Sequence, residues 1–106
     1  MTAEHAFVAV LRIHLHFPDA GSLKAKRSEL NAVKAGLQQR FGVALAEVDH
    51  QDTWQRSELL AAVCGGGDGR VADHADAVER WLEGRLPQGV RVERCVASWA
   101  DLESIG

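Results

Sequence analysis

One stretch near the N-terminus constrains the fold more than any other part of the chain. Residues 6–17 (AFVAVLRIHLHF) alternate between an apolar set and a mixed set of side chains. Successive side chains of an extended chain point to opposite faces, so this alternation predicts a strand with one buried face. The buried set is Phe7, Ala9, Leu11, Ile13, Leu15 and Phe17; the other, open set is Val8, Val10, Arg12, His14 and His16.

The remaining chain predicts two helices and three further strands. Apolar residues at helical spacing indicate helices over 23–40 and 71–86, with Gly42 and Pro87 just past their ends. Strands are expected over 43–49, 57–64 and 90–99, a glycine turn over 65–69, and a loose tail over 100–106. The order is β-α-β-β-α-β. We therefore expect one α+β domain over residues 1–106, a ferredoxin-like four-stranded antiparallel sheet with two helices on one face.

The core can be predicted from the two helical stripes. The first consists of Leu23, Leu30, Val33 and Leu37, and the second of Val71, Ala75, Val78 and Leu82. Cys64 and Cys95 belong to no CxxC or CxxH pattern, and both lie in strand-like apolar runs. They are expected to be reduced core residues, with a disulfide as the alternative.

Composition excludes several classes of protein. Of the 106 residues, 46% are hydrophobic and 25% are charged, which argues against disordered, collagen-like and coiled-coil chains. The N-terminus lacks the pattern of a secretory signal peptide. No apolar run approaches the roughly 20 residues that a membrane helix needs. A cytoplasmic protein with no membrane contact is expected.

The charge is unevenly distributed along the chain. Twelve basic and fifteen acidic residues give a net charge of −3, which argues against a strongly basic nucleic-acid binder. Residues 1–42 hold six bases and three acids, a net of +3, whereas residues 43–106 hold six bases and twelve acids, a net of −6. A local basic surface for an anionic partner is therefore compatible with the acidic total.

The start of the first helix carries an unusual group of cations. Ser22 is the expected N-cap, and Lys24, Lys26 and Arg27 follow it, although a helix start favours anions. Lys26 falls inside the apolar stripe. It must therefore extend past the sheet edge to solvent or meet a carboxylate.

Two interpretations of this group remain open. The predicted topology brings Glu47, Asp49 and His50, at the end of the second strand, to the same end of the sheet. The first interpretation is a network of ion pairs that ties the helix to that strand. The second is an anion site in which free backbone N–H groups and lysines bind phosphate, of RNA or of a small metabolite.

These residues also carry a resemblance to a known family. SLKAKR at 22–27 and AEVDHQDTWQ at 46–55 match, in order, two motifs of the YlxP-like family of small bacterial proteins of unknown function. The resemblance runs from about residue 8 to residue 86. This chain departs from it at Gly42, where relatives often carry Asn, and at the glycine turn. The resemblance implies a ferredoxin-like fold. Because relatives are encoded near translation and ribosome-maturation genes, it also implies a connection with RNA or the ribosome, but no catalytic residue.

Other chemistry-bearing residues give weaker patterns. Asp49, His50 and Asp52 lack a nucleophile that would make them a catalytic set, so a solvated connection with Asp caps is favoured. Trp54 is expected to anchor against the core, with base stacking as the alternative. His14 and His16 could ligate a metal only with a third ligand from a neighbouring strand. An exposed polar face, a dimer surface or part of a nucleic-acid surface is the expected role.

These patterns favour a non-enzymatic RNA- or ribosome-associated binding protein with no cofactor and no metal. The alternatives are a homodimeric interaction module acting through the open sheet face, and an anionic-metabolite binder or enzyme at the first helix start. The candidate residues are Ser22, Lys24, Lys26 and Arg27 for the anion, Glu47, Asp49, His50 and Trp54 as their partners, and Arg12, His14 and His16 on the open face.

Overall fold

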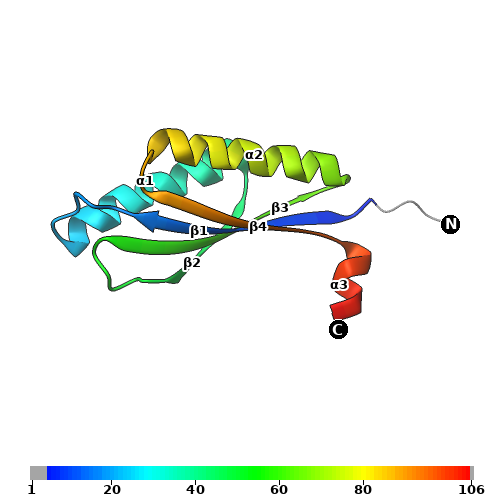
Figure 1. The fold of residues 1–106 in the computed structure, drawn as a ribbon, viewed down its shortest axis with the longest axis horizontal. Helices are drawn as coiled ribbons and strands as arrows, with labels where there is room; N and C mark the ends of the chain where they lie inside the picture. The colour runs from blue at the N-terminus through cyan, green and yellow to red at the C-terminus, as the bar shows by residue number, and fades with distance from the viewer. Residues whose placement is uncertain (1–4, 106) are drawn as a thin grey trace.

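The computed structural model describes residues 5–105. Its elements are β1 (Phe7–His16), α1 (Leu23–Phe41), β2 (Ala44–Asp49), β3 (Arg56–Gly65), α2 (Asp68–Arg85), β4 (Val90–Ser98) and α3 (Trp99–Ile105). The four strands form one antiparallel sheet in the order β2-β3-β1-β4. Helices α1 and α2 cover one face of this sheet (Figure 1). The predicted ferredoxin-like α+β architecture is confirmed.

The alternation in β1 is the basis of the two-faced sheet. Ala9, Leu11, Ile13 and Leu15 are buried under the helices, whereas the residues between them lie on the other face. The register continues both faces across the central strands. Ile13 stands opposite Leu59 of β3 and Val92 of β4, and all three belong to the core or pack against it. The face without α1 and α2 is called the open face below.

Helix α1 begins and ends where the sequence predicts. Ser22 Oγ accepts the N–H of Ala25 at 3.0 Å. Gly42 ends the helix with φ 61°, a left-handed conformation that glycine adopts without strain. Leu30, Val33 and Leu37 are buried as expected. Leu23 is 39% exposed, so its place in the core was wrong. It is the first residue of the helix, at the helix's outer end.

The C-terminal segment corrects the expected loose tail. Residues Trp99–Ile105 form α3. Asp101 Oδ2 accepts the N–H of Ser98 at 2.9 Å, and Ser98 Oγ accepts the N–H of Asp101 at 3.1 Å. This reciprocal pair is a capping box, which the sequence Ser-x-x-Asp at 98–101 encodes. In Figure 1, α3 turns to the side of the sheet opposite α1 and α2.

Two other expectations need correction. Cys64 and Cys95 are free thiols, but both are exposed rather than buried in the core. In the register they stand opposite Val8 and Val10, which places them on the open face. Helix α2 starts at Asp68 instead of residue 71, because Gly67 is the extended N-cap and its carbonyl accepts the N–H of Val71.

None of the described helices has both the length and the apolar composition needed to cross a bilayer.

Candidate functional site

Lys26 is the most unusual buried group near the predicted site. Its residue exposure is 0%. The ammonium donates hydrogen bonds to the backbone carbonyls of Thr53 at 2.6 Å and His50 at 2.7 Å, and a longer one to Gln51 at 3.4 Å. Three donors thus meet three carbonyl oxygens. The expected outcome, a carboxylate partner or an exit to solvent, was wrong. Burial of the charge lowers the pKa of Lys26.

The connection between β2 and β3 is folded to present these carbonyls. His50 has φ 62°, a left-handed conformation uncommon for a residue other than glycine. Asp49 Oδ1 accepts the N–H of His50 at 2.7 Å, and the His50 carbonyl also accepts the N–H of Thr53 at 3.2 Å. The expected Asp cap is therefore present. Because the turn is tight, the ammonium of Lys26 reaches three of its carbonyl oxygens at once.

A separate ion-pair cluster joins α1 to β2. Arg27 Nη1 donates to Glu47 Oε2 at 2.6 Å, and Lys34 Nζ lies 3.7 Å from Glu47 Oε1. The hydrogen bond from Arg27 holds the pKa of Glu47 below its ordinary value of 4.5. Two of the three cations at the helix start thus have protein partners. Among residues 5–105, no hydrogen bond or ion pair engages the exposed Lys24 side chain.

Glu47→Gln is expected to lower stability at pH 7 by about 1 kcal/mol, since a largely buried charge-assisted hydrogen bond is replaced by a neutral one. The folded pKa is depressed, so the unfolded chain binds more protons below pH 4.5. The stabilisation from Glu47 is present above that pH and is lost as the pH falls through the folded pKa. Urea unfolding from pH 7 to pH 3 should show a shallower acid decline in Glu47→Gln. Glu29→Gln, at an exposed position, serves as the control; an equal change there would contradict the assignment.

A basic pocket lies where the ends of three strands meet on the open face. His16 of β1 stands opposite Arg56 of β3, and His14 stands opposite Arg91 of β4. These four side chains line a pocket of about 190 Å³ with Gly89, and no carboxylate is among its lining residues. We call these four residues the basic end. The alternation in β1 predicts the two histidines on this face, but not that the two arginines share a pocket with them, because that depends on the register.

Two glutamates lie beside the basic end, and their hydrogen bonds and ion pairs show which basic side chains already have protein partners. Glu58 is buried and accepts a hydrogen bond from Arg12 Nε at 2.7 Å. Glu93 lies 2.7 Å from His14 Nε2 and 3.3 Å from Arg91 Nη1. The bond with His14 lowers the pKa of Glu93. Neither glutamate contacts Arg56, and the described residues offer the Arg56 guanidinium no ion pair.

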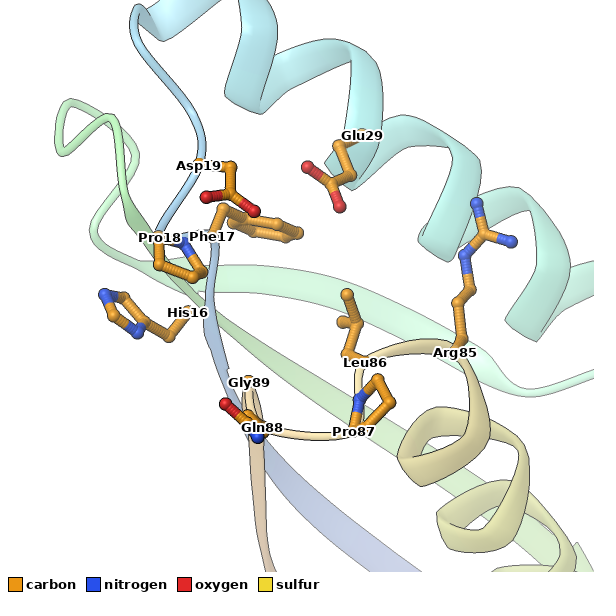
Figure 2. A pocket seen from close by; sticks show the side chains of 10 residues that line it. All are labelled: His16, Phe17, Pro18, Asp19, Glu29, Arg85, Leu86, Pro87, Gln88 and Gly89. Atoms are coloured by element: carbon orange, nitrogen blue, oxygen red, sulfur yellow. The ribbon is translucent and has the colours of Figure 1, made fainter.

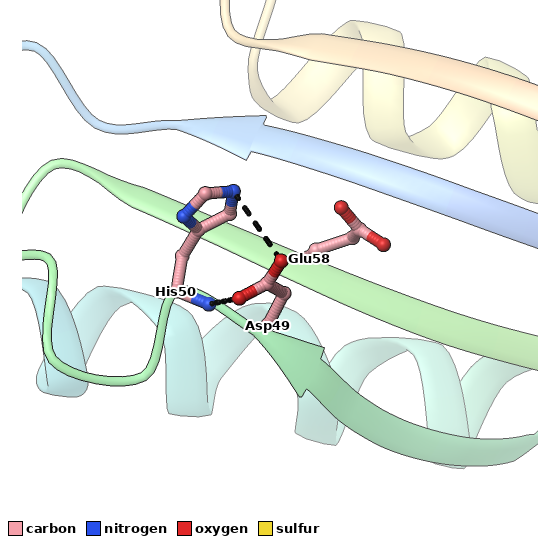
Figure 3. Close-up of side chains that lie close together, drawn as sticks. All are labelled: Asp49, His50 and Glu58. Carbon is pink, nitrogen blue, oxygen red and sulfur yellow. Dashed lines mark hydrogen bonds and ion pairs between the residues drawn. The ribbon is translucent and has the colours of Figure 1, made fainter.

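One group of side chains has the composition of a metal site. Donor atoms of Asp49, His50 and Glu58 lie within 4.8 Å of one another (Figure 3). Their present partners are protein groups: Arg12 for Glu58, and the His50 backbone N–H for Asp49. His16 is not part of this group, and of its three members His14 has an ion pair only with Glu58, at 3.4 Å.

A second pocket, of about 340 Å³, lies between α1 and the turn that joins α2 to β4. Figure 2 shows Glu29, Asp19 and Arg85 around it and Phe17 and Leu86 within it. It contains no serine, cysteine or threonine nucleophile.

Trp54 contradicts its expected role in the core. The residue is 51% exposed on the connection to which Lys26 is hydrogen-bonded. It lies two residues before Arg56, at the same end of the sheet as the basic end. The alternative role, stacking on a base, stays a prediction.

Comparisons with known proteins support the family resemblance that the motifs at residues 22–27 and 46–55 indicate. A model of the family described as "Protein of unknown function (DUF503)" matches residues 8–103. The uncharacterized protein YlxP of Bacillus subtilis (strain 168) is 48% identical over 46 residues, which are 42% of this chain and 50% of that protein. The match thus spans about half the length of this relative.

One solved structure supports the fold, and nothing beyond the fold. The de novo designed protein Foldit4 superposes with a TM-score of 0.55 at 11% identity, over 87% of this chain and 96% of that chain. A second designed protein, LFR1 1 with ferredoxin fold, has a TM-score of 0.45 at 13% identity over 84% and 83% of the two chains.

Proposed function

We propose that this chain, which belongs to the family of proteins of unknown function DUF503, is a non-enzymatic protein that binds RNA through the basic end of its open face. One observation carries the proposal: two arginines and two histidines line one pocket whose lining holds no carboxylate. Guanidinium groups bind phosphate oxygens in a bidentate geometry, and phosphate contacts supply most of the affinity for nucleic acids.

The acidic residues of the chain do not oppose this proposal. Five of the twelve acids in residues 43–106 belong to α2: Asp68, Asp73, Asp76, Glu79 and Glu83. That helix lies on the other side of the sheet (Figure 1). On the open face, Arg12, Arg56 and Arg91 balance Asp49, Glu58 and Glu93, so the net charge of −3 arises elsewhere in the chain. At the basic end an RNA would meet the exposed guanidinium groups of Arg56 and Arg91.

The arrangement supports phosphate binding rather than base stacking on the sheet. RNA-recognition sheets of this fold stack bases on aromatic residues of the central strands, and the open faces of β1 and β3 carry none. The exposed Trp54 provides one stacking platform beside Arg56. Lys24, at the start of α1 on the same end of the molecule, adds a free cation. The resemblance to proteins encoded near ribosome-maturation genes makes ribosomal RNA the first ligand to test.

The size of the pocket argues against a small metabolite as the ligand. Pockets for small molecules usually enclose about 300–1,000 Å³, and this one holds about 190 Å³. A single phosphate group fits such a volume, and in RNA the rest of the ligand lies outside the pocket along the surface.

The test is binding of a fluorescent ribosomal RNA fragment at 50 and 200 mM salt. Wild-type affinity should fall steeply with salt, because each phosphate contact releases counterions. The double variant Arg56→Ala with Arg91→Ala should weaken binding by about tenfold or more at 50 mM. It should also reduce the slope of log affinity against log salt by about 1–2.

The matched control is Arg70→Ala with Arg80→Ala, which removes the same charge from exposed positions of α2. Its affinity should stay within about twofold of wild type. No binding by the wild-type protein at 50 mM salt, or equal losses in both double variants, would contradict the proposal.

A further inference from the structure

The open face divides into two halves of different chemistry. The basic end and its two glutamates occupy one half. The other half carries only apolar residues and cysteines, continuous across β3, β1 and β4 in the register: Leu60, Ala62, Cys64, Val8, Val10, Cys95 and Ala97. We call this set the apolar half. In the part of the chain that the structure describes, neither α1 nor α2 covers it (Figure 1).

Helix α3 extends this apolar surface beyond the sheet. A groove of about 660 Å³ runs between α3 and the start of β1; its lining includes Phe7, Val8, Cys64, Trp99 and Leu102. Leu102 is 41% exposed, and Ile105, at the end of the helix, is 80% exposed. Contiguous apolar surface of this kind on a small protein is typical of a site of protein association.

We propose that a second copy of this chain covers the apolar half and the α3 groove, forming a two-fold symmetric dimer. In a two-fold dimer the same surface meets itself, so it must be self-complementary in charge. The apolar half satisfies this condition because it carries no acidic or basic side chain. In the half that contains the basic end, the formal charges sum to zero: Arg12, Arg56 and Arg91 are balanced by Asp49, Glu58 and Glu93. The apolar half of one copy can therefore face the apolar half of another without burying a charged side chain.

The chain is more extended than a compact domain of the same length. Its radius of gyration is 15.2 Å, against about 13 Å for a compact domain of this length. Its accessible surface is 6520 Å², against roughly 5,800 Å² for a compact monomer of 11.5 kDa. The chain therefore exposes more surface than a compact monomer of its mass, in keeping with its elongated shape.

The first test is the mass in solution, measured by sedimentation velocity over a range of concentrations. The wild-type protein should sediment at twice the chain mass of 11.5 kDa at high micromolar concentration. Leu60→Asp on the apolar half and Leu102→Asp on α3 should each weaken the dimer by about tenfold or more, because each buries a charge in the interface. Since both residues are about 40% exposed in one copy, the folded monomer should tolerate the change.

Leu23→Asp is the matched control. Leu23 is 39% exposed, against 40% for Leu60, but it lies on α1 on the opposite layer. The Leu23→Asp variant should dimerise with the same affinity as the wild-type protein. A second readout uses the two free thiols: maleimide should label Cys64 and Cys95 more slowly as the wild-type concentration rises. Circular dichroism verifies that each variant is folded.

A wild-type monomer at all concentrations would overturn the proposal. So would a dimer that survives both Leu60→Asp and Leu102→Asp, since that dimer forms elsewhere. Because Arg56→Ala with Arg91→Ala leaves the apolar half intact, its mass should equal that of wild type. The dimer and the RNA proposal can therefore fail independently.

Discussion

Lys26→Met is expected to lower the free energy of unfolding by about 3 kcal/mol. Methionine keeps the length and the apolar stem of the side chain but has no donor. Hydrogen bonds to a charged group contribute about 1.5–3 kcal/mol each, and Lys26 makes two short ones, to His50 and Thr53. The buried ammonium costs desolvation energy, which its removal recovers in part. Urea unfolding at pH 7 measures the difference.

The control for this variant is Lys24→Met, two residues earlier. Lys24 is exposed, and the described residues offer it no hydrogen bond or ion pair, so the expected change is within about 0.5 kcal/mol. The turn over residues 50–53 provides a second readout. Limited proteolysis should cleave it faster in Lys26→Met, because the carbonyls lose the group that holds them. A loss below 1 kcal/mol with unchanged proteolysis would contradict the role assigned to Lys26.

The same lysine shows where sequence reasoning reached its limit. The helical stripe alone placed Lys26 in the core, and its burial confirms this part of the prediction. The stripe could not identify the hydrogen-bond partner of the Lys26 ammonium. The sequence suggested acidic side chains as partners, whereas the partners in the structure are backbone carbonyls. Those carbonyls converge only through the left-handed conformation of His50. Arg27 was different: its partner Glu47 is a side chain on the neighbouring strand, which topology alone brought close.

The open face illustrates the same distinction. Alternation in β1 was enough to place Arg12, His14 and His16 on it. The sequence did not bring Arg56 and Arg91 into one pocket with the two histidines, because that convergence depends on register, which is set by pairing between strands 40 or more residues apart. Cys64 was misplaced for a related reason: an apolar run of a strand does not by itself indicate which of its residues face the core. In contrast, the capping box of α3 was readable at Ser98 and Asp101, and the expected loose tail overlooked it.

Gly89→Ala is expected to destabilise the protein by about 2–3 kcal/mol, the range of overpacked positions. Gly89 directly precedes β4 and lies beside His16, the last residue of β1. A Cβ atom at this position would overlap the carbonyl oxygen of His16, a backbone atom that cannot rotate away. The two strands must separate there. The hydrogen bond from the His16 N–H to the Gly89 carbonyl, 2.8 Å long, is then stretched. Thermal or urea unfolding measures the effect.

Gly84→Ala is the control for the same chemical change. Gly84 lies within α2 with nothing inside 4 Å of the added Cβ, so alanine should stabilise the protein by about 0.5–1 kcal/mol. Opposite signs at the two glycines would show that close approach of the backbone, not glycine flexibility, decides the outcome at residue 89. Because Gly89 also lines the basic pocket between His16 and Arg91, its alanine variant should bind RNA more weakly even under conditions where it is fully folded. Unchanged stability in Gly89→Ala would mean that β4 can shift without cost, and the geometry of the basic end would then not be fixed by this contact.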